Sequence, residues 1–459
     1  MRMSDTEAIM WAVEKDPALR SDFCNLTILD RRPSDERMRA TMERALAAIP
    51  RLRQRVIGAP LRLVPPEFAD DPNLDVESHV RVVGVPPPGD ERAFFDLCGS
   101  LSEQSLDRAR PLWEFTIIDG MAGGRAALLQ KVHHAITDGV GGLRLSLAMV
   151  DFERDPEPVE APDDHVPSGA VRHDTPLDVT RQAIADAATR RIGAVRSVIG
   201  TAGHAVTHPL ELPSKAGEAA RFVGSLQRQS FVSDPARSDV LTDRSLRRRF
   251  EVHALVLSEL HAAARSLGGS INDAFVTGLA SALGRYHQRF GSDVEELRVA
   301  MPVSTRQRGD RETTNAFAPV RLLVPIQPAH DVVALFKEMH DRLEAAKGES
   351  AVTAAAGLAG LVSGLPTSLL VALTRSQTRT IDFAASNLRG SPVPLYLAGA
   401  RILANYPFGP RTGSPLNVTM LSYCDELHLG CNIDPAAVVD PEAFLIDLRD
   451  AYAELIRYA

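Results

Sequence analysis

The chain has 459 residues, of which 44% are hydrophobic and 24% are charged, and its formal net charge is −8. This length predicts two or more structural domains, and the negative charge argues against nucleic acid as the main partner. The four cysteines have no CxxC spacing, so we expect free buried thiols in a reducing cytoplasm, although Cys424 and Cys431 could be neighbours in one hairpin.

Residues 1–152 alternate helical and strand-like patterns. Apolar residues at helical spacing predict helices over 37–55 and 93–106. Strands are predicted over 113–119 and 125–132, with a turn at Gly120 to Gly124 between them. This hairpin should place Trp113 and Glu114 beside His133, and a glycine-rich turn entering an apolar helix should follow over 139–150.

Residues 153–230 are expected to connect two domains. Residues 153–178 are acidic and rich in proline, as in an exposed linker. Residues 177–208 have the spacing of an amphipathic helix with several arginines. Such a helix either packs its apolar face on the protein or lies on an anionic membrane. The acidic start of the chain lacks the apolar core of a signal peptide.

Residues 231–459 alternate again and predict a second domain. Helices are expected over 255–268, over 271–290 and from Pro441 onward, and strands over 297–302, 318–325, 416–423 and 426–432. No residue between Glu349 and Arg375 is charged. Pro366 should divide this segment into two core helices; a membrane span, an apolar tunnel wall or a surface that dips into lipid are the alternatives.

The segment from Lys131 to Gly139 carries the chemistry that the sequence shows most clearly. His133 and His134 stand at the end of a predicted buried strand, four to five residues before Asp138. Histidine titrates near neutral pH, so a fixed histidine can accept a proton and return it. On a helix, His134 and Asp138 could both face a metal ion, but the segment is expected to turn and no third ligand is evident, so we expect no metal site.

The pattern HHxxxDG resembles the signature of the coenzyme-A-dependent acyltransferases. Four further segments are similar to motifs of the bacterial wax ester synthase/diacylglycerol acyltransferase family: Pro111-Leu112-Trp113, Asn272-Asp273, residues 301–306, and an Asn387 loop followed by a strand over 394–399. They occur in the family's order along the whole chain. The resemblance implies an α/β fold with mixed sheets, in which two chloramphenicol-acetyltransferase-like domains, 1–152 and 231–459, enclose an active-site channel.

The resemblance and the chemistry together suggest roles for single residues. We expect His134 to be the general base and His133 to support the strand end. Asp138 either orients the base or pairs with an arginine, for which Arg306 is a candidate. Asn272 is expected to position substrate or bind the oxyanion, and a helix cap is the alternative for the Asn272-Asp273 pair.

Other residues are expected to bind substrate. Gly139 and Gly142 should allow close approach of the backbone, and Pro111, Leu112 and Trp113 should shape the channel wall. Asp273 and Asn387 complete the predicted substrate contacts. The cluster of Arg244, Arg247, Arg248 and Arg249 could meet the phosphates of coenzyme A, or could form a solvated basic face.

The function that the resemblance implies is acyl transfer from acyl-coenzyme A, a co-substrate rather than a bound cofactor, to diacylglycerol or a long-chain alcohol. The enzyme would be cytoplasmic and peripheral on the inner membrane or on lipid droplets. Two alternatives stay open: a condensation-type acyltransferase that uses carrier-protein thioesters, and a catalytically silent lipid-binding homologue. No oligomeric state is indicated.

Overall fold

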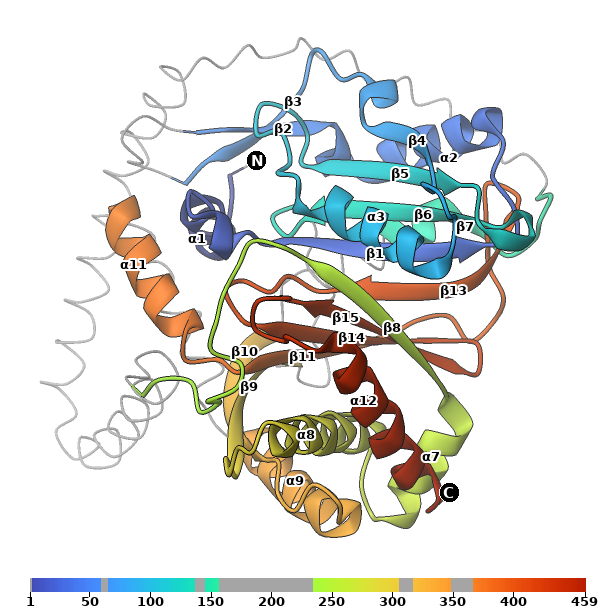
Figure 1. Cartoon of the computed structure of the whole chain (residues 1–459). Helices are drawn as coiled ribbons and strands as arrows, with labels where there is room; N and C mark the ends of the chain where they lie inside the picture. The colour runs from blue at the N-terminus through green and yellow to red at the C-terminus, as the bar shows by residue number, and fades with distance from the viewer. Residues whose placement is uncertain (1, 59–64, 137–144, 157–233, 305–316, 348–365) are drawn as a thin grey trace, which may run out of the picture.

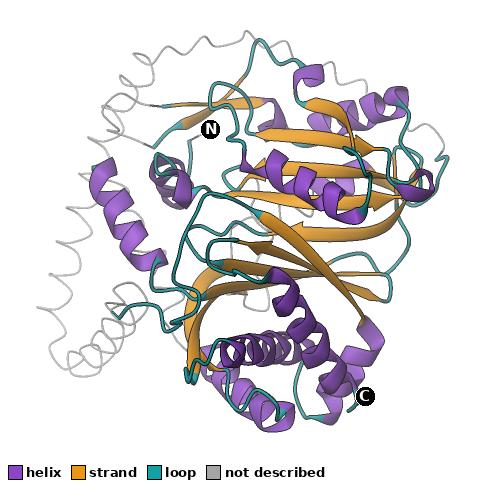
Figure 2. Ribbon diagram, viewed as in Figure 1, coloured by secondary structure: helices purple, strands orange, loops and turns teal. Residues whose placement is uncertain are grey.

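Two β-sheets with helices on their outer faces make up the molecule (Figures 1 and 2). The computed structural model describes residues 2–58, 65–136, 145–156, 234–304, 317–347 and 366–459. The predicted linker beyond 156 and the predicted helix over 177–208 therefore lie outside the described residues.

The first sheet has seven strands. Its order is β4 (Val80–Gly84), β5 (Trp113–Asp119), β6 (Ala126–His133), β1 (Asp22–Leu29), β13 (Ala400–Phe408), β12 (Tyr396–Leu397) and β7 (Val150–Asp151). The predicted hairpin is confirmed, because β5 and β6 pair with Trp113 opposite Val132. All eight residues of β6 are buried between its two neighbours, although Gln130, Lys131 and His133 are polar.

Helices and a small β-ribbon accompany this sheet. They are α1 (Asp5–Val13), η1 (Pro17–Leu19), α2 (Asp35–Ala48), η2 (Pro50–Arg53), η4 (Val76–Ser78), α3 (Glu91–Glu103) and η5 (Ala122–Gly124), with β2 (Gln54–Ile57) and β3 (Glu67–Asp70). The helix predicted over 37–55 was too long. It ends at Ala48 because Pro50 cannot continue the hydrogen bonding of an α-helix, and residues 54–57 pair with β3 instead.

The second sheet has six strands. Its order is β10 (Phe317–Pro325), β9 (Glu296–Ser304), β11 (Phe383–Arg389), β14 (Leu416–Tyr423), β15 (Glu426–Ile433) and β8 (Arg249–Val256). The predicted strands near 297–302, 318–325, 416–423 and 426–432 are all confirmed. The helix expected from 255 begins at Leu257 because residues 249–256 pair with β15.

A helical layer covers the second sheet (Figure 1). It contains α7 (Leu257–Ser266), α8 (Ile271–Arg289), α9 (Val332–Lys347) and α12 (Pro441–Ile456), and their apolar faces form one core with the sheet. A further helix, α11 (Thr367–Thr378), starts after Pro366 as predicted and packs on α1 through Leu370. Among the helices that the structure describes, none is long and apolar enough to cross a membrane.

Two strands from the second half of the sequence, β12 and β13, belong to the first sheet, and β13 joins them to it. β13 pairs with β1 from Cys24 opposite Phe408 to Leu29 opposite Ile402, so residues 400–408 lie beside residues 22–29. On its other side β13 approaches the second sheet, where the rings of Phe250 and Phe408 stack at 3.9 Å. The two halves expected from the sequence are therefore interleaved at this strand.

Candidate active site

The paired histidines lie where β6 ends, and neighbouring strands hold the backbone of both. The amide N–H of His133 donates to the Leu112 carbonyl at 3.0 Å, just before β5 begins. The amide N–H of His134 donates to the Ser21 carbonyl at 3.3 Å, just before β1 begins. Because β1 and β5 flank β6, the strand end that carries the histidines is fixed from both sides.

The ring of His133 is enclosed by protein. Its Nδ1 accepts the backbone N–H of Ala135 at 2.9 Å, so in the neutral ring the proton sits on Nε2. This Nε2 lies 2.7 Å from Glu14 Oε1, with the carboxylate off the direction of an aligned hydrogen bond. His133 is only 2% exposed, and Glu14 Oε1 also accepts the N–H of Ser21 at 2.7 Å. These contacts fit the supporting role predicted for His133.

His134 has a different environment. It stands in the turn after β6 and is half-buried, and its ring lies 5.1 Å from the ring of Phe23. Arg51 holds the next residue by donating to the Ala135 carbonyl at 2.5 Å, and it also pairs with Glu7. Glu14 and Arg51 were not predicted as supports of the histidine turn, because only the tertiary fold brings them there.

The Pro111-Leu112-Trp113 segment is buried in the core beside the histidine strand. Trp113 Nε1 donates to the Leu52 carbonyl at 2.9 Å, and the indole stacks on His79 at 4.4 Å between ring centroids. Burial lowers the pKa of His79, which favours the neutral ring in this stack. The segment contacts the histidines through the Leu112 carbonyl, which accepts the N–H of His133, and the role of the three side chains as a channel wall stays a prediction.

The Asn272-Asp273 pair opens α8. Asp273 Oδ2 accepts the N–H of Ser270 at 2.7 Å while Ser270 Oγ accepts the N–H of Asp273 at 3.3 Å, which is a capping box. His340 Nδ1 also lies 3.0 Å from Asp273 Oδ2, and this hydrogen bond raises the pKa of His340. The helix-cap alternative therefore holds for Asp273. Asn272 is half-buried next to it, and the substrate role of both residues stays a prediction.

The loop predicted around Asn387 is wrong, because Asn387 lies within β11, opposite Met420 of β14. Pairing with β14 overrides the loop-like composition of this segment, and the Asn387 side chain is exposed. The predicted site residues Asp138, Gly139 and Gly142, together with Arg306, lie outside the described residues.

The basic cluster at 244–249 is not a uniform solvated face. Arg248 is buried and pairs with the equally buried Asp22 at 2.8 Å, which joins the approach to β8 to the start of β1. Burial alone would raise the pKa of Asp22, but the charge and hydrogen bond of Arg248 outweigh this effect and lower it. Arg249 pairs with Glu251 at 2.7 Å, and Arg244 lines a cavity close to Arg248.

Two family models match the chain. Residues 3–275 match the model described as the wax ester synthase/diacylglycerol acyltransferase catalytic domain. Residues 313–456 match the model described as the WS/DGAT C-terminal domain. The first match covers more than half of the sequence and includes the paired histidines, and together the two matches extend almost to the end of the chain.

Curated relatives match over the full length. A protein of Mycobacterium tuberculosis strain H37Rv, provisionally named a diacylglycerol O-acyltransferase, is 35% identical over 467 aligned positions, which cover 100% of this chain and 93% of the relative. A second protein of that strain, with the same provisional name, is 29% identical and covers 100% of this chain and 97% of its own length.

Solved structures of low sequence identity share the fold. The wax ester synthase/diacylglycerol acyltransferase from Marinobacter aquaeolei VT8 is 21% identical, with a TM-score of 0.65 over 99% of this chain and 98% of that one. A starter condensation domain of rhizomide synthetase, solved with C8-CoA, is 13% identical, with a TM-score of 0.56 over 99% and 93%. The α/β class with acyltransferase-like sheets that the sequence predicted is confirmed.

Proposed function

The chain belongs to the wax ester synthase/diacylglycerol acyltransferase family, and we propose that it is an O-acyltransferase that uses acyl-coenzyme A. The acceptor is the hydroxyl of diacylglycerol or of a long-chain alcohol, and the product is triacylglycerol or a wax ester. The names of the relatives support diacylglycerol as the first acceptor to test. The enzyme works at a lipid surface, where both the acyl chain and the acceptor are found.

We propose direct transfer in a ternary complex with His134 as the base. The acceptor oxygen attacks the thioester carbonyl as His134 takes the hydroxyl proton. The C–S bond then breaks, and His134 returns the proton to the departing thiolate. Asn272 and the turn at Gly139 and Gly142 are the proposed contacts for the substrate carbonyl, and Asp138 keeps this turn in shape.

The observation that supports His134 over its neighbour is the environment of the two rings. His133 is buried, its Nδ1 accepts a backbone N–H, and its Nε2 faces Glu14, so both ring nitrogens lie against protein groups. His134 stands in the turn after the same strand and is only half-buried. A general base needs such a position, because it must touch both the acceptor hydroxyl and the leaving sulfur.

The test is thiol release from palmitoyl-coenzyme A by purified protein, with diacylglycerol, with hexadecanol and without acceptor. His134→Ala should lower acceptor-dependent release by about 10²- to 10⁴-fold, which is the usual contribution of a general base. The matched control is His261→Ala, which removes an exposed histidine on α7 and should keep the native rate.

Three results would count against this proposal. Native-like release by folded His134→Ala would exclude His134 as the base. Release by the native protein only from a pantetheine-loaded carrier protein would favour condensation-type chemistry, and bound lipid without any ester product would favour a silent lipid-binding role.

A further inference from the structure

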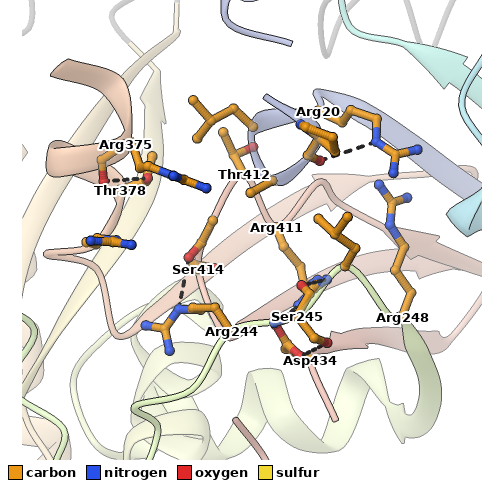
Figure 3. A pocket seen from close by; sticks show the side chains of 16 residues that line it. Arg20, Arg244, Ser245, Arg248, Arg375, Thr378, Arg411, Thr412, Ser414 and Asp434 are labelled. Carbon is orange, nitrogen blue, oxygen red and sulfur yellow. Dashed lines mark hydrogen bonds and ion pairs between the residues drawn. The ribbon is translucent and has the colours of Figure 1, made fainter. Parts of the chain in front are cut away.

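A cavity of about 80 Å³ is lined by 16 residues, six of which are arginines (Figure 3). Several separate segments contribute them: the end of η1, the chain before β8, the last turn of α11 and the β13–β14 connection. The lining arginines are Arg20, Arg244, Arg248, Arg375, Arg379 and Arg411. Asp434 is the acidic residue of the lining, so the cavity concentrates positive charge in a protein whose net charge is −8.

Three of these arginines are neutralised by carboxylates. The ion pairs are Arg411 with Asp434 at 2.6 Å, Arg248 with Asp22 at 2.8 Å, and Arg375 with Asp16 at 3.0 Å. For the other three, the part of the chain that the structure describes places no carboxylate at ion-pair distance. Arg20 and Arg244 donate instead to backbone carbonyls, which carry no full charge. Arg379 is exposed at the end of α11.

Arg411 carries a buried N–H group that has no hydrogen-bond acceptor among the described residues. Its side chain is only 10% exposed, and among the described residues its Nε has no hydrogen-bond partner. Burial lowers the pKa of Arg411. Burial also lowers the pKa of Arg244, and repulsion from the charges of Arg411 and Arg379 acts in the same direction. A bound anion would relieve this repulsion and could accept the free N–H.

The cavity is also held in shape before anything binds. The connection that carries Arg411 packs tightly on α11: a side chain at Gly413, which has φ 83°, would come within 2.8 Å of Thr378 Oγ1. Arg20 is held by its hydrogen bond to the Glu103 carbonyl at 2.8 Å, and Figure 3 shows Arg20 and Arg248 pointing toward one another. Preorganised donors lose little entropy when a ligand binds.

We propose that this cavity, the arginine pocket, binds a phosphate group. The planar guanidinium fork matches phosphate oxygens in pairs, and a lining with six arginines and one aspartate favours a doubly charged phosphate monoester over a carboxylate. The pocket adjoins the histidines through consecutive residues, because Arg20 lines it and the carbonyl of Ser21 accepts the N–H of His134. Two sources carry such a phosphate: coenzyme A and the headgroup of an anionic lipid. Naming coenzyme A rests on the proposed function.

Isothermal titration of the full chain with inorganic phosphate is the test. The native protein should bind phosphate, and Arg379→Gln should weaken binding about 10-fold, as loss of one charge-assisted hydrogen bond predicts. Arg244→Gln is the second variant. Arg265→Gln is the control, because it removes the same charge from an exposed site on α7 and should bind like the native protein. Thermal unfolding shows that each variant is folded.

Competition against phosphate binding then identifies which molecule supplies the phosphate group. Stronger competition by coenzyme A than by dephospho-coenzyme A would assign the pocket to the 3′-phosphate of the acyl donor. Competition by vesicles that contain phosphatidic acid, but not by phosphatidylcholine vesicles, would assign it to a lipid headgroup. Absence of phosphate binding to the native protein, or equal weakening in Arg265→Gln, would overturn the proposal. Binding needs no turnover, so a failure of acyl transfer alone would leave this result intact.

Discussion

Burial gives neighbouring residues of one type different chemistry in this chain. His133 and His134 are adjacent in the sequence, but only the second is half-exposed, while the first is enclosed by Glu14 and a backbone N–H. The same contrast separates Arg248, whose charge is matched by buried Asp22, from Arg379, which is exposed. The residue type therefore limits the reactions in which a side chain could take part, and its burial and partners decide how accessible it is for them.

Half-buried His253 makes the stability of the protein depend on pH. Burial, with a smaller contribution from Arg449, lowers the pKa of His253 on β8 from its ordinary value of 6.5 to about 4. The unfolded chain binds the proton more tightly than the folded one, so stability is complete above pH 6.5 and falls as the pH is lowered toward 4. His253 should thus account for a loss on the order of 2 kcal/mol between pH 7.5 and pH 5.

Urea unfolding of native protein and His253→Leu at these two pH values measures that loss. The variant should show a smaller drop in the free energy of unfolding than the native protein. His261→Gln, at an exposed site on α7, should keep the full native drop. An equal drop in native protein and His253→Leu would show that His253 stays solvated.

The two sheets meet where β13 passes over β15. Gly430 of β15 lies directly beneath β13, and a side chain there would overlap the carbonyl oxygen of Pro407 and press on the ring of Phe408. Backbone atoms cannot yield as a flexible side chain would. The close approach of the sheets therefore depends on the missing side chain at this position.

Gly430→Ala should lower the free energy of unfolding by about 1–3 kcal/mol, the usual cost of overpacking. The matched control is Gly84→Ala in the edge strand β4, where the added methyl group meets open space. Denaturant unfolding of the two variants compares them directly. Equal stability of both would mean that the sheets separate at β13 without cost.

The fold of the whole molecule depends on the two strands, β12 and β13, that the second half of the chain contributes to the first sheet. Residues of β12 and β13, with the turn between them, belong to the core of the first sheet: Leu397, Ala398, Ala400 and Ile402 are buried there. Without them, the edge of β1 and this apolar surface would be open to solvent. An unpaired strand edge beside apolar surface promotes aggregation.

Residues 1–230 expressed alone should therefore aggregate, and co-expression with residues 231–459 should yield a soluble complex. Size-exclusion chromatography and near-ultraviolet circular dichroism of both preparations test this expectation. A soluble 1–230 fragment that unfolds cooperatively would show that the first sheet is stable without β13, and that the predicted domain boundary marks an independent unit.

Local patterns sufficed for the family resemblance, for β6 and its terminal histidines, for β5, and in the second half for β9, β10, β14 and β15. These features depend on residues close together in the chain, whose periodicity and spacing are visible in the sequence. The capping box at α8 was likewise open to sequence reasoning, because Ser270 and Asp273 are three residues apart.

Tertiary structure alone decided the rest. Asn387 lies in a strand because β14 pairs with it, and β13 joins a sheet built by residues far earlier in the chain. Glu14 reaches His133, and several distant segments bring arginines to one cavity. No local pattern records such contacts, because they depend on how separate elements pack and on which charges that packing leaves buried.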